Sequence, residues 1–305
     1  MKEFDVTIVG AGIAGLSAAI YLKRSSLTSV VLDKGAPGGK LLNIHEIDNY
    51  PGLGPVSGPE LAMKSMDHAT KLGVIYEYGN VLGITKDGDD YIVSTDMDQY
   101  RSKAVIIATG TQTKVLGVPG EKEHTGRGVS YCATCDGNFF RKKPVAVIGF
   151  KDQAVEEAIY LAGLASELFF VIPEPLDAED KHIETLKGFE NVHFLEGYNL
   201  KSIEGEKLVD TIVIEKEGKE EKLSVNGVFP LYGQRSTSDF LEPLGVTLQN
   251  GFVVTNETMA SSLPGLFAAG DIRFKKLRQV VTAASDGAEA ATSAIQYVNA
   301  LKKKK

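Results

Sequence analysis

The stretch Val9-Gly10-Ala11-Gly12-Ile13-Ala14-Gly15 decides how this chain begins to fold. It follows an apolar, β-branched run over residues 5–9 and leads into an apolar segment over 16–22, so it predicts a strand, a tight glycine turn and a helix. In such a unit the first glycine permits the turn. The second lets a pyrophosphate approach the backbone at the helix N-terminus, and the third lets the helix pack on the strand.

A lone glycine motif of this spacing is weak evidence, because a glycine-rich turn without a ligand has the same pattern. Here the next predicted strand, residues 29–32, ends at Asp33. This acid lies about 20 residues beyond the glycines, where a carboxylate would bond the ribose of a dinucleotide. The context therefore favours dinucleotide binding.

Two further turns follow in the same region. Gly35-Ala36-Pro37-Gly38-Gly39-Lys40 is rich in glycine for a simple connector, and Asn49-Tyr50-Pro51-Gly52 predicts a turn. Both could be plain loops, but a large flat cofactor needs backbone that comes close to its ring and phosphates, which favours cofactor contact. Residues 75–107 then predict three short strands with a hairpin at 86–89, closed by a buried strand that runs into Gly110.

The same pattern begins again after Pro119-Gly120. Residues 145–149 predict a strand, 153–165 a helix and 167–172 a second strand, while 209–233 repeat the hairpin and buried strand. The chain therefore contains two copies of one nucleotide-binding architecture. We expect an α/β fold with two Rossmann-like, three-layer domains, each with a small antiparallel β-meander.

The C-terminal part is expected to complete the first copy. An apolar strand over 265–269 ends at Gly270-Asp271, and a long helix runs from about 281 to 301. Because the first copy lacks its closing elements, we predict that the second is inserted in it, with crossings near Val115 and Arg235. The domains would be 1–114 with 236–305, and 115–235.

The only two cysteines of the 305 residues lie in Cys132-Ala133-Thr134-Cys135, directly before Asp136. Such a pair can form a reversible disulfide, in which one sulfur attacks as thiolate and the other resolves the mixed disulfide. Asp136 would supply a proton donor and acceptor. Half a zinc site would need further Cys or well-spaced His, and two buried small hydrophobes are a second alternative. A CxxC beside βαβ patterns favours the redox interpretation.

Composition argues against several functions. Forty acidic against thirty-three basic residues give a net charge of −7, so there is no surplus of cations for a nucleic acid. The N-terminus carries acids where a signal peptide carries only bases, and no apolar stretch approaches the length of a membrane span. We expect a cytoplasmic protein with no nucleic acid and no membrane partner.

From end to end, these motifs resemble those of bacterial-type, low-molecular-weight flavin thioredoxin reductases. The resemblance implies FAD in the split domain, a redox disulfide in the inserted one, a homodimer, and thioredoxin or a thioredoxin-like protein as partner. It is carried by Gly10-x-Gly12-x-x-Gly15, Gly38-Gly39, Asn49-Tyr50-Pro51-Gly52, Ala108-Thr109-Gly110, Cys132-Ala133-Thr134-Cys135-Asp136, and Ala269-Gly270-Asp271 with Arg278-Gln279.

The resemblance also implies roles for single residues. Cys135 would face the flavin, Cys132 would attack the thioredoxin disulfide, and Asp136 would act as acid and base. No metal ligand is implied. Lys40 stands where the family usually has Gln. The implied FAD contacts are Gly10, Gly12, Gly15, Asp33, Lys34, Gly39, Lys40, Asn49, Asp271, Arg278, Gln279 and Val280.

The second nucleotide turn departs from the family pattern Gly-Gly-Gly-x-Ser-Ala, because this chain reads Gly149-Phe150-Lys151-Asp152-Gln153-Ala154. A side chain at the second glycine position fills the space of a pyrophosphate. The family's His-Arg-Arg cluster for the 2′-phosphate of NADPH is replaced by the acidic stretch 173–180. NAD(P)H is therefore a doubtful cofactor, although Lys151 could hold a phosphate as a point charge. The chain resembles the reductases that use another donor, such as reduced ferredoxin; flavodoxin is a further candidate.

These observations support a leading function and three alternatives. The leading one is an FAD enzyme that reduces a thioredoxin-like disulfide with a donor other than NADPH. The alternatives are a reductase of another protein disulfide, an ordinary NADPH-dependent thioredoxin reductase, and a non-catalytic flavin-binding redox sensor. Both cysteines and Asp136 are present, which favours an enzyme because a pure binding module does not need them.

Overall fold

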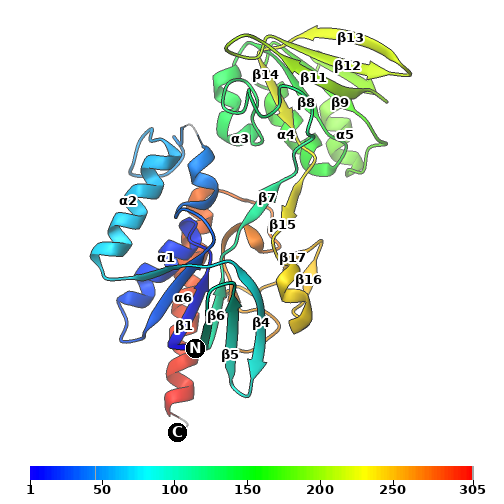
Figure 1. Cartoon of the computed structure of the whole chain (residues 1–305). Helices are drawn as coiled ribbons and strands as arrows, with labels where there is room; N and C mark the ends of the chain where they lie inside the picture. Colours follow the sequence, from blue (N-terminus) through cyan, green and yellow to red (C-terminus); the bar gives the residue numbers. More distant parts are fainter. Residues whose placement is uncertain (45, 304–305) are drawn as a thin grey trace. The chain divides into compact units, whose positions relative to one another are not determined.

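A computed structural model describes residues 1–44 and 46–303 of the chain (Figure 1). The chain divides into two compact units, unit 1 with residues 1–112 and 235–305 and unit 2 with residues 113–234. It leaves unit 1 along β7 (Thr111–Thr113) and returns along β15 (Gln234–Ser236). These two strands pair in a small sheet of their own, so the two connections between the units run side by side.

Unit 1 is built on a seven-stranded sheet in the order β3-β2-β1-β6-β5-β4, with β18 beside β6. The pairs among β1, β2, β3, β6 and β18 are parallel, whereas β4, β5 and β6 form an antiparallel meander. The long β6 therefore belongs to both the parallel sheet and the meander. The bounds are β1 (Lys2–Val9), β2 (Ser29–Asp33), β3 (Ile75–Tyr78), β4 (Val81–Asp87), β5 (Asp90–Thr95), β6 (Gln99–Ile107) and β18 (Leu266–Ala268).

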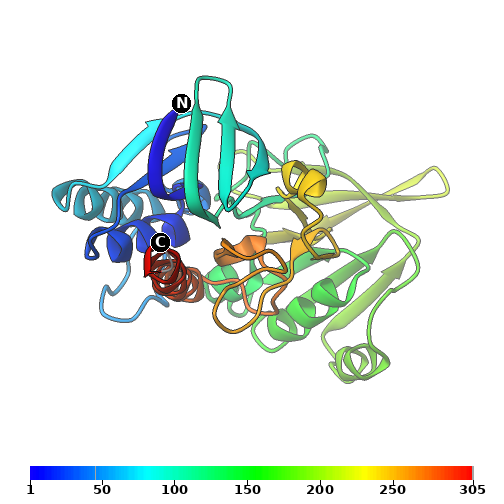
Figure 2. The same cartoon turned by 90° about the horizontal axis from the view of Figure 1, so that it is seen from below.

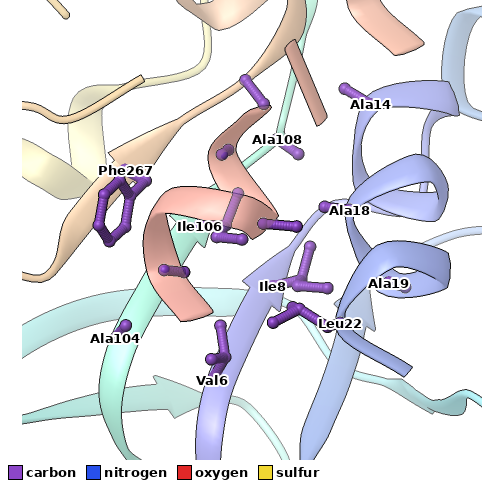
Figure 3. Close-up of a cluster of buried hydrophobic side chains, with 14 of the residues drawn as sticks. Val6, Ile8, Ala14, Ala18, Ala19, Leu22, Ala104, Ile106, Ala108 and Phe267 are labelled. Atoms are coloured by element: carbon purple, nitrogen blue, oxygen red, sulfur yellow. The ribbon is translucent and has the colours of Figure 1, made fainter. Parts of the chain in front are cut away.

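Two helices from opposite ends of the sequence, α1 (Ile13–Lys23) and α6 (Val280–Lys303), lie side by side on one face of this sheet (Figure 2). Small side chains let them approach closely, since a Cβ at Gly287 of α6 would come within 2.1 Å of the Ala14 carbonyl oxygen. Figure 3 shows the core between helix and sheet, formed by Ala14, Ala18, Ala19, Leu22, Val6, Ile8 and Ile106. Each fully buried Leu or Ile stabilises such a core by about 1.5–3 kcal/mol.

The opposite face of the sheet is covered by η3 (Asp239–Leu244) and the short hairpin of β16 (Leu248–Gln249) and β17 (Phe252–Val253). The core on this side consists of Val9, Leu32, Ile107, Leu241, Val253 and their neighbours. Two further elements, η1 (Gly39–Asn43) and α2 (Gly58–Lys71), enclose a smaller apolar cluster around Leu41, Ile47 and Leu61.

Unit 2 repeats the three-layer plan. Its parallel sheet has the order β10-β9-β8-β14, and an antiparallel sheet β11-β12-β13 packs on one face of it while the helices cover the other. The bounds are α3 (Ala133–Asp136), η2 (Gly137–Phe140), β8 (Pro144–Ile148), α4 (Asp152–Ala162), β9 (Glu167–Ile172), α5 (Asp180–Lys187), β10 (Val192–Glu196), β11 (Asn199–Glu204), β12 (Thr211–Lys216), β13 (Lys219–Ser224) and β14 (Gly227–Pro230). The expected fold class is confirmed.

The structure corrects several details of the sequence prediction. The helix predicted over 153–165 ends at Ala162, because Gly163 follows it as C-cap. The buried strand predicted directly before Gly110 is the second half of a longer strand that begins at Gln99, and the first half of that strand pairs in the meander. In the described part of the chain, no helix is long and apolar enough to cross a membrane.

Candidate active site

The glycine turn of unit 1 lies between β1 and α1, at the carboxyl edge of the parallel strands. Gly10 has a φ of +110°, and a Cβ there would lie 2.4 Å from the Ala108 carbonyl oxygen. A Cβ at Gly15 would lie 1.8 Å from the Gly10 carbonyl oxygen. In contrast, a Cβ at Gly12 would meet no atom within 4 Å. Gly10 and Gly15 are therefore required by the packing of the protein itself, whereas Gly12 faces the space in which a ligand phosphate would approach.

This difference gives a direct test of the cofactor site. Gly12 has extended backbone angles (φ −70°, ψ 179°) that any residue adopts, so Gly12→Val should fold normally. Its side chain would fill the phosphate space, and we expect FAD binding at least tenfold weaker, measured by fluorescence titration of the apoprotein. Gly15→Ala is the matched comparison, because its methyl group clashes with backbone and should lower the thermal stability. Normal FAD binding by a folded Gly12→Val protein would contradict this site.

Asp33 holds the glycine turn at the end of β2. Its carboxylate accepts hydrogen bonds from the Ala11 amide (2.6 Å) and the Gly35 amide (2.9 Å). The next residue, Lys34, is exposed. Asp33 therefore lies where the sequence predicted a ribose-binding acid, and it also orders the two loops that flank the site.

The loop 35–40 lies directly against this turn. The Gly38 amide donates to the Ala11 carbonyl oxygen (2.8 Å), and a Cβ at Gly39 would lie 3.4 Å from the Gly12 Cα. Gly39 has a φ of +55° and begins η1, which positions Lys40. The positive φ of Gly38 (+123°) and Gly39 explains why glycine occurs at these two positions, and a Cβ at Gly38 would also lie 2.6 Å from the Ala62 Cβ.

Lys40 joins two segments that are far apart in sequence. Its ammonium group contacts the Thr111 hydroxyl and lies 3.3 Å from the Asp271 carboxylate on η4 (Gly270–Ile272). Burial lowers the pKa of Lys40, although the charge of Asp271 opposes this shift. Arg278 donates to the Asp271 carbonyl oxygen (3.3 Å) and stacks on the Phe252 ring (4.3 Å). Lys40, Asp271 and Arg278 thus form one charged group.

The remaining residues of the predicted set meet at the start of α6, which Asn49 reaches from the segment between η1 and α2. The Asn49 amide group donates to the Gln279 side-chain oxygen (3.1 Å), and Val280 packs on the apolar cluster around Leu41. Three buried hydroxyls among the described residues, those of Thr7, Ser102 and Thr109, have no hydrogen-bond partner. Thr109 follows β6 directly before Gly110, at the same carboxyl edge as the glycine turn. An elongated ligand with phosphates and polar ring atoms fits this open glycine, charged group and unsatisfied hydroxyl.

Sequence reasoning missed one group that supports this site. Asp286 of α6 is 8% exposed, accepts a hydrogen bond from the Gly270 amide (3.0 Å), and pairs with Arg273 (2.8 Å) and Lys275 (2.7 Å). It therefore anchors the segment that carries Asp271 and Arg278. The available signal was one of two acids, Asp286 and Glu289, within an alanine-rich stretch of α6.

In unit 2, Cys132 and Cys135 form a disulfide with 5.3 Å between their Cα atoms. Both sulfurs are used in this bond, so in this state the cysteines are neither zinc ligands nor two separate buried hydrophobes. Cys135 lies within α3 and Cys132 directly before it. The Thr134 hydroxyl lies 3.4 Å from the Cys132 sulfur, which in the disulfide can only accept. The Ser130 hydroxyl donates to the Asp136 carboxylate (2.6 Å), so Asp136 is held beside the two cysteines.

Asp136→Asn tests the proposed proton transfer. We expect disulfide turnover to fall on the order of 10²-fold, because positioned acid and base groups contribute at least that much. FAD content should not change, since Asp136 belongs to unit 2. The side-chain oxygen of the introduced asparagine can still accept the hydrogen bond from the Ser130 hydroxyl. The measurement is steady-state reduction of a thioredoxin disulfide together with the flavin absorbance. Turnover equal to that of the wild type would make Asp136 a turn residue only.

The second nucleotide turn is occupied by the protein's own groups. Phe150 packs edge-on against Tyr232, with 5.9 Å between the rings. The Phe150 carbonyl oxygen accepts from the Asp177 amide (2.8 Å), and Lys151 forms a β-bridge with Asp177. The loop after β9 therefore lies directly against the turn that would bind a pyrophosphate.

Asp152 fills the remaining polar position at the start of α4. Its carboxylate accepts from the Glu179 amide (2.9 Å) and bonds His182 (2.8 Å). Burial alone would raise the pKa of Asp152, but these hydrogen bonds lower it below the ordinary value. Asp152, Glu156 and His182 have their polar atoms within 4.8 Å of one another. A fixed anion thus lies in the first turn of α4, the end of the helix at which a dinucleotide's phosphates bind in this type of unit.

Known proteins of similar sequence and structure match the chain over both of its units. The family model for pyridine nucleotide-disulphide oxidoreductase matches residues 4–287. Thioredoxin reductase of Bacillus subtilis (strain 168) is 43% identical, over 98% of this chain and 96% of that protein. The crystal structure of thioredoxin reductase from Streptococcus pyogenes MGAS5005 has a TM-score of 0.93 at 40% identity, covering 98% and 99% of the two chains. A ferredoxin-flavin thioredoxin reductase from Clostridium acetobutylicum is more distant, with a TM-score of 0.56 and 28% identity over 99% of each chain.

Two nucleotide-type units joined to a CxxC disulfide define a flavin-dependent disulfide oxidoreductase, and the chain belongs to the pyridine nucleotide-disulphide oxidoreductases. Within that class it belongs to the bacterial-type thioredoxin reductase family. The family expected from the sequence motifs is confirmed.

Proposed function

We propose that this thioredoxin reductase passes electrons from reduced FAD through the Cys132–Cys135 disulfide to thioredoxin or a thioredoxin-like protein, using a donor other than NADPH. In this proposal FAD supplies two-electron redox chemistry when it is bound in unit 1. Its holding residues are the set around Gly12, Asp33, Lys40 and Asp271. Residues 113–234 act as the disulfide-bearing domain.

The observation that carries the proposal is the closed second turn. In a nucleotide-binding unit the glycine turn and the helix N-terminus must both face the pyrophosphate. Here the backbone of Phe150 and Lys151 is paired with Asp177, and the carboxylate of Asp152 is bonded to the Glu179 amide. A dinucleotide would have to displace this loop and approach a fixed negative charge.

The proposed class of electron donor is one that needs no nucleotide pocket on this protein. A protein that delivers electrons directly needs no nucleotide pocket, so a reduced ferredoxin or flavodoxin is compatible with a closed turn. One related structure is named as a ferredoxin-flavin thioredoxin reductase. The names of the more similar relatives state no donor.

The reduced cysteines can carry out the second half of the reaction. Cys132, as thiolate, attacks one sulfur of the partner disulfide and releases the other as a thiolate, which takes a proton. Cys135 then attacks the Cys132 sulfur of the mixed disulfide, which restores the Cys132–Cys135 bond and releases the reduced partner. Asp136 lies next to Cys135 and is held by Ser130, a position suited to moving the protons.

An ordinary NADPH-dependent reductase is the second candidate, because Lys151 precedes α4 and carries a positive charge. The Lys151 ammonium group lies 5.9 Å from the centre of the Phe150 ring, so it has a cation–π partner within the protein in place of a phosphate. The experiment that decides between these two donors is anaerobic titration of the yellow holoprotein with NADPH, NADH and dithionite, followed by flavin absorbance.

We further propose a cytoplasmic homodimer, in keeping with the family.

A further inference from the structure

A buried carboxyl group contacts the backbone that carries the cysteines. Glu157 lies on α4, and its Oε2 accepts a hydrogen bond from the Ala133 amide at 2.7 Å. Its Oε1 accepts from the Gln153 side chain at 2.8 Å. The Ala133 amide belongs to the peptide group that joins Ala133 to Cys132, so the carboxyl group lies one peptide away from the disulfide.

The environment of Glu157 differs from that of the other acids on α4. Asp152 and Glu156 lie beside His182 of α5, whereas Glu157 is directed at α3. Burial raises the pKa of Glu157, although its two hydrogen bonds oppose the shift and the charge of Glu156 adds to it. The carboxyl group is thus easier to protonate than an exposed glutamate.

We propose that Glu157 is a positioning residue of the redox disulfide, which fixes the Cys132–Ala133 peptide and sets how readily the reduced Cys132 ionises. The proposal rests on this disulfide being the redox centre. Reduction breaks the S–S bond with two electrons and two protons, and loss of one proton leaves a thiolate. An ionised Glu157 nearby opposes a Cys132 thiolate by like-charge repulsion, and a neutral one does not. The two groups therefore titrate as a coupled pair.

Other titratable groups near this contact have different partners. Asp136 on α3 accepts from Ser130, and Glu156 on α4 lies 3.8 Å from His182, which α5 contributes. Tyr160 on α4 lies beside Gly137, where a Cβ would be 3.0 Å from its ring. Among these acids, Glu157 is the one that bonds the peptide between Cys132 and Ala133.

The test measures thiol reactivity, with no donor or partner present, in the holoenzyme with Cys135→Ser so that only Cys132 reacts. The rate of iodoacetamide alkylation is followed against pH. Glu157→Gln keeps an oxygen that accepts from the Ala133 amide but removes the charge. We expect the profile to shift toward lower pH and the rate at pH 7 to rise about three- to tenfold.

Two further variants make the result decisive. Glu156→Gln removes a charge one residue away on the same helix, from a side chain that lies beside His182 instead, and should shift the profile much less than Glu157→Gln does. Glu157→Asp keeps the charge and should retain a profile closer to the wild type than Glu157→Gln does. If Glu157→Gln gives the unshifted profile, or if Glu156→Gln shifts it equally, the proposal is overturned. The alkylation assay uses no electron donor and no partner protein. A failure of the proposed function, such as turnover with NADPH only, would therefore leave the alkylation profiles unchanged, and the two proposals can fail separately.

Discussion

NADPH and NADH are expected to leave the flavin of this enzyme oxidised at micromolar concentrations. Each charge-assisted hydrogen bond from an Arg to the 2′-phosphate stabilises NADPH by about 1.5–3 kcal/mol. The family resemblance places a cluster of basic residues where this chain has the acidic stretch 173–180, and the loss of two such bonds would weaken binding by very roughly 10²–10⁴-fold. Repulsion from the exposed acids adds little, because salt screens it.

NADH should be nearly as poor a donor as NADPH, for a reason that involves the turn itself. NADH lacks the 2′-phosphate, so the missing arginines do not affect it. It still needs the pyrophosphate position, and the turn there carries the side chains of Phe150 and Lys151 and is paired with the Asp177 backbone. The two nucleotides should therefore differ less from each other than either differs from an effective donor.

Anaerobic absorbance titration measures this directly. Dithionite is the positive control, since it must bleach the flavin and permit turnover of a thioredoxin disulfide. A double variant with Phe150→Gly and Lys151→Gly should improve NADH more than NADPH, because it reopens the turn without restoring a 2′-phosphate site. Rapid bleaching of the wild-type flavin by micromolar NADPH would return the protein to the ordinary NADPH-dependent group.

The sequence predicted those parts of the fold that have a strong local pattern. The strand-glycine-helix units at Gly10 and Gly149 were identified because apolar runs and glycines must occur in a fixed order there. The helices α2 and α5 were missed, since both are largely polar segments packed on the surface of their units. The first strand of the second meander, β11, was also missed, because its alternating pattern is short and interrupted by a bulge.

The residues of the candidate site could be predicted only where a short local motif indicates a reaction or a ligand by its residue types alone. The disulfide and the glycine turn are of this kind. Asp286, Glu157 and Glu121 are not, because their roles depend on segments that meet only in the folded chain. Glu121, for example, is 3% exposed and accepts hydrogen bonds from the Gly117 amide (2.7 Å) and the Tyr131 hydroxyl (3.0 Å). It ties the segment after the first crossing to the residue before Cys132, and no local pattern indicates such a contact.

Replacement of either cysteine should abolish disulfide turnover, and the two variants should fail in different ways. Cys135→Ser retains Cys132, the thiol proposed to attack the partner, so it should accumulate a stable mixed disulfide with oxidised thioredoxin. Cys132→Ser should not trap the partner. It retains Cys135, the thiol proposed to face the flavin, and should show a long-wavelength absorption band that Cys135→Ser lacks.

The local structure supports this assignment of the attacking sulfur. The Thr134 hydroxyl lies 3.4 Å from the Cys132 sulfur and can donate to a thiolate there, which favours the reactive form. Cys135 follows within α3, next to Asp136, where a proton can be supplied or removed. Non-reducing electrophoresis of each variant with thioredoxin shows which cysteine is trapped, and the double variant is the control for non-specific adducts. A mixed disulfide formed by Cys132→Ser alone would reverse the two roles, because only Cys135 remains in that protein to form it.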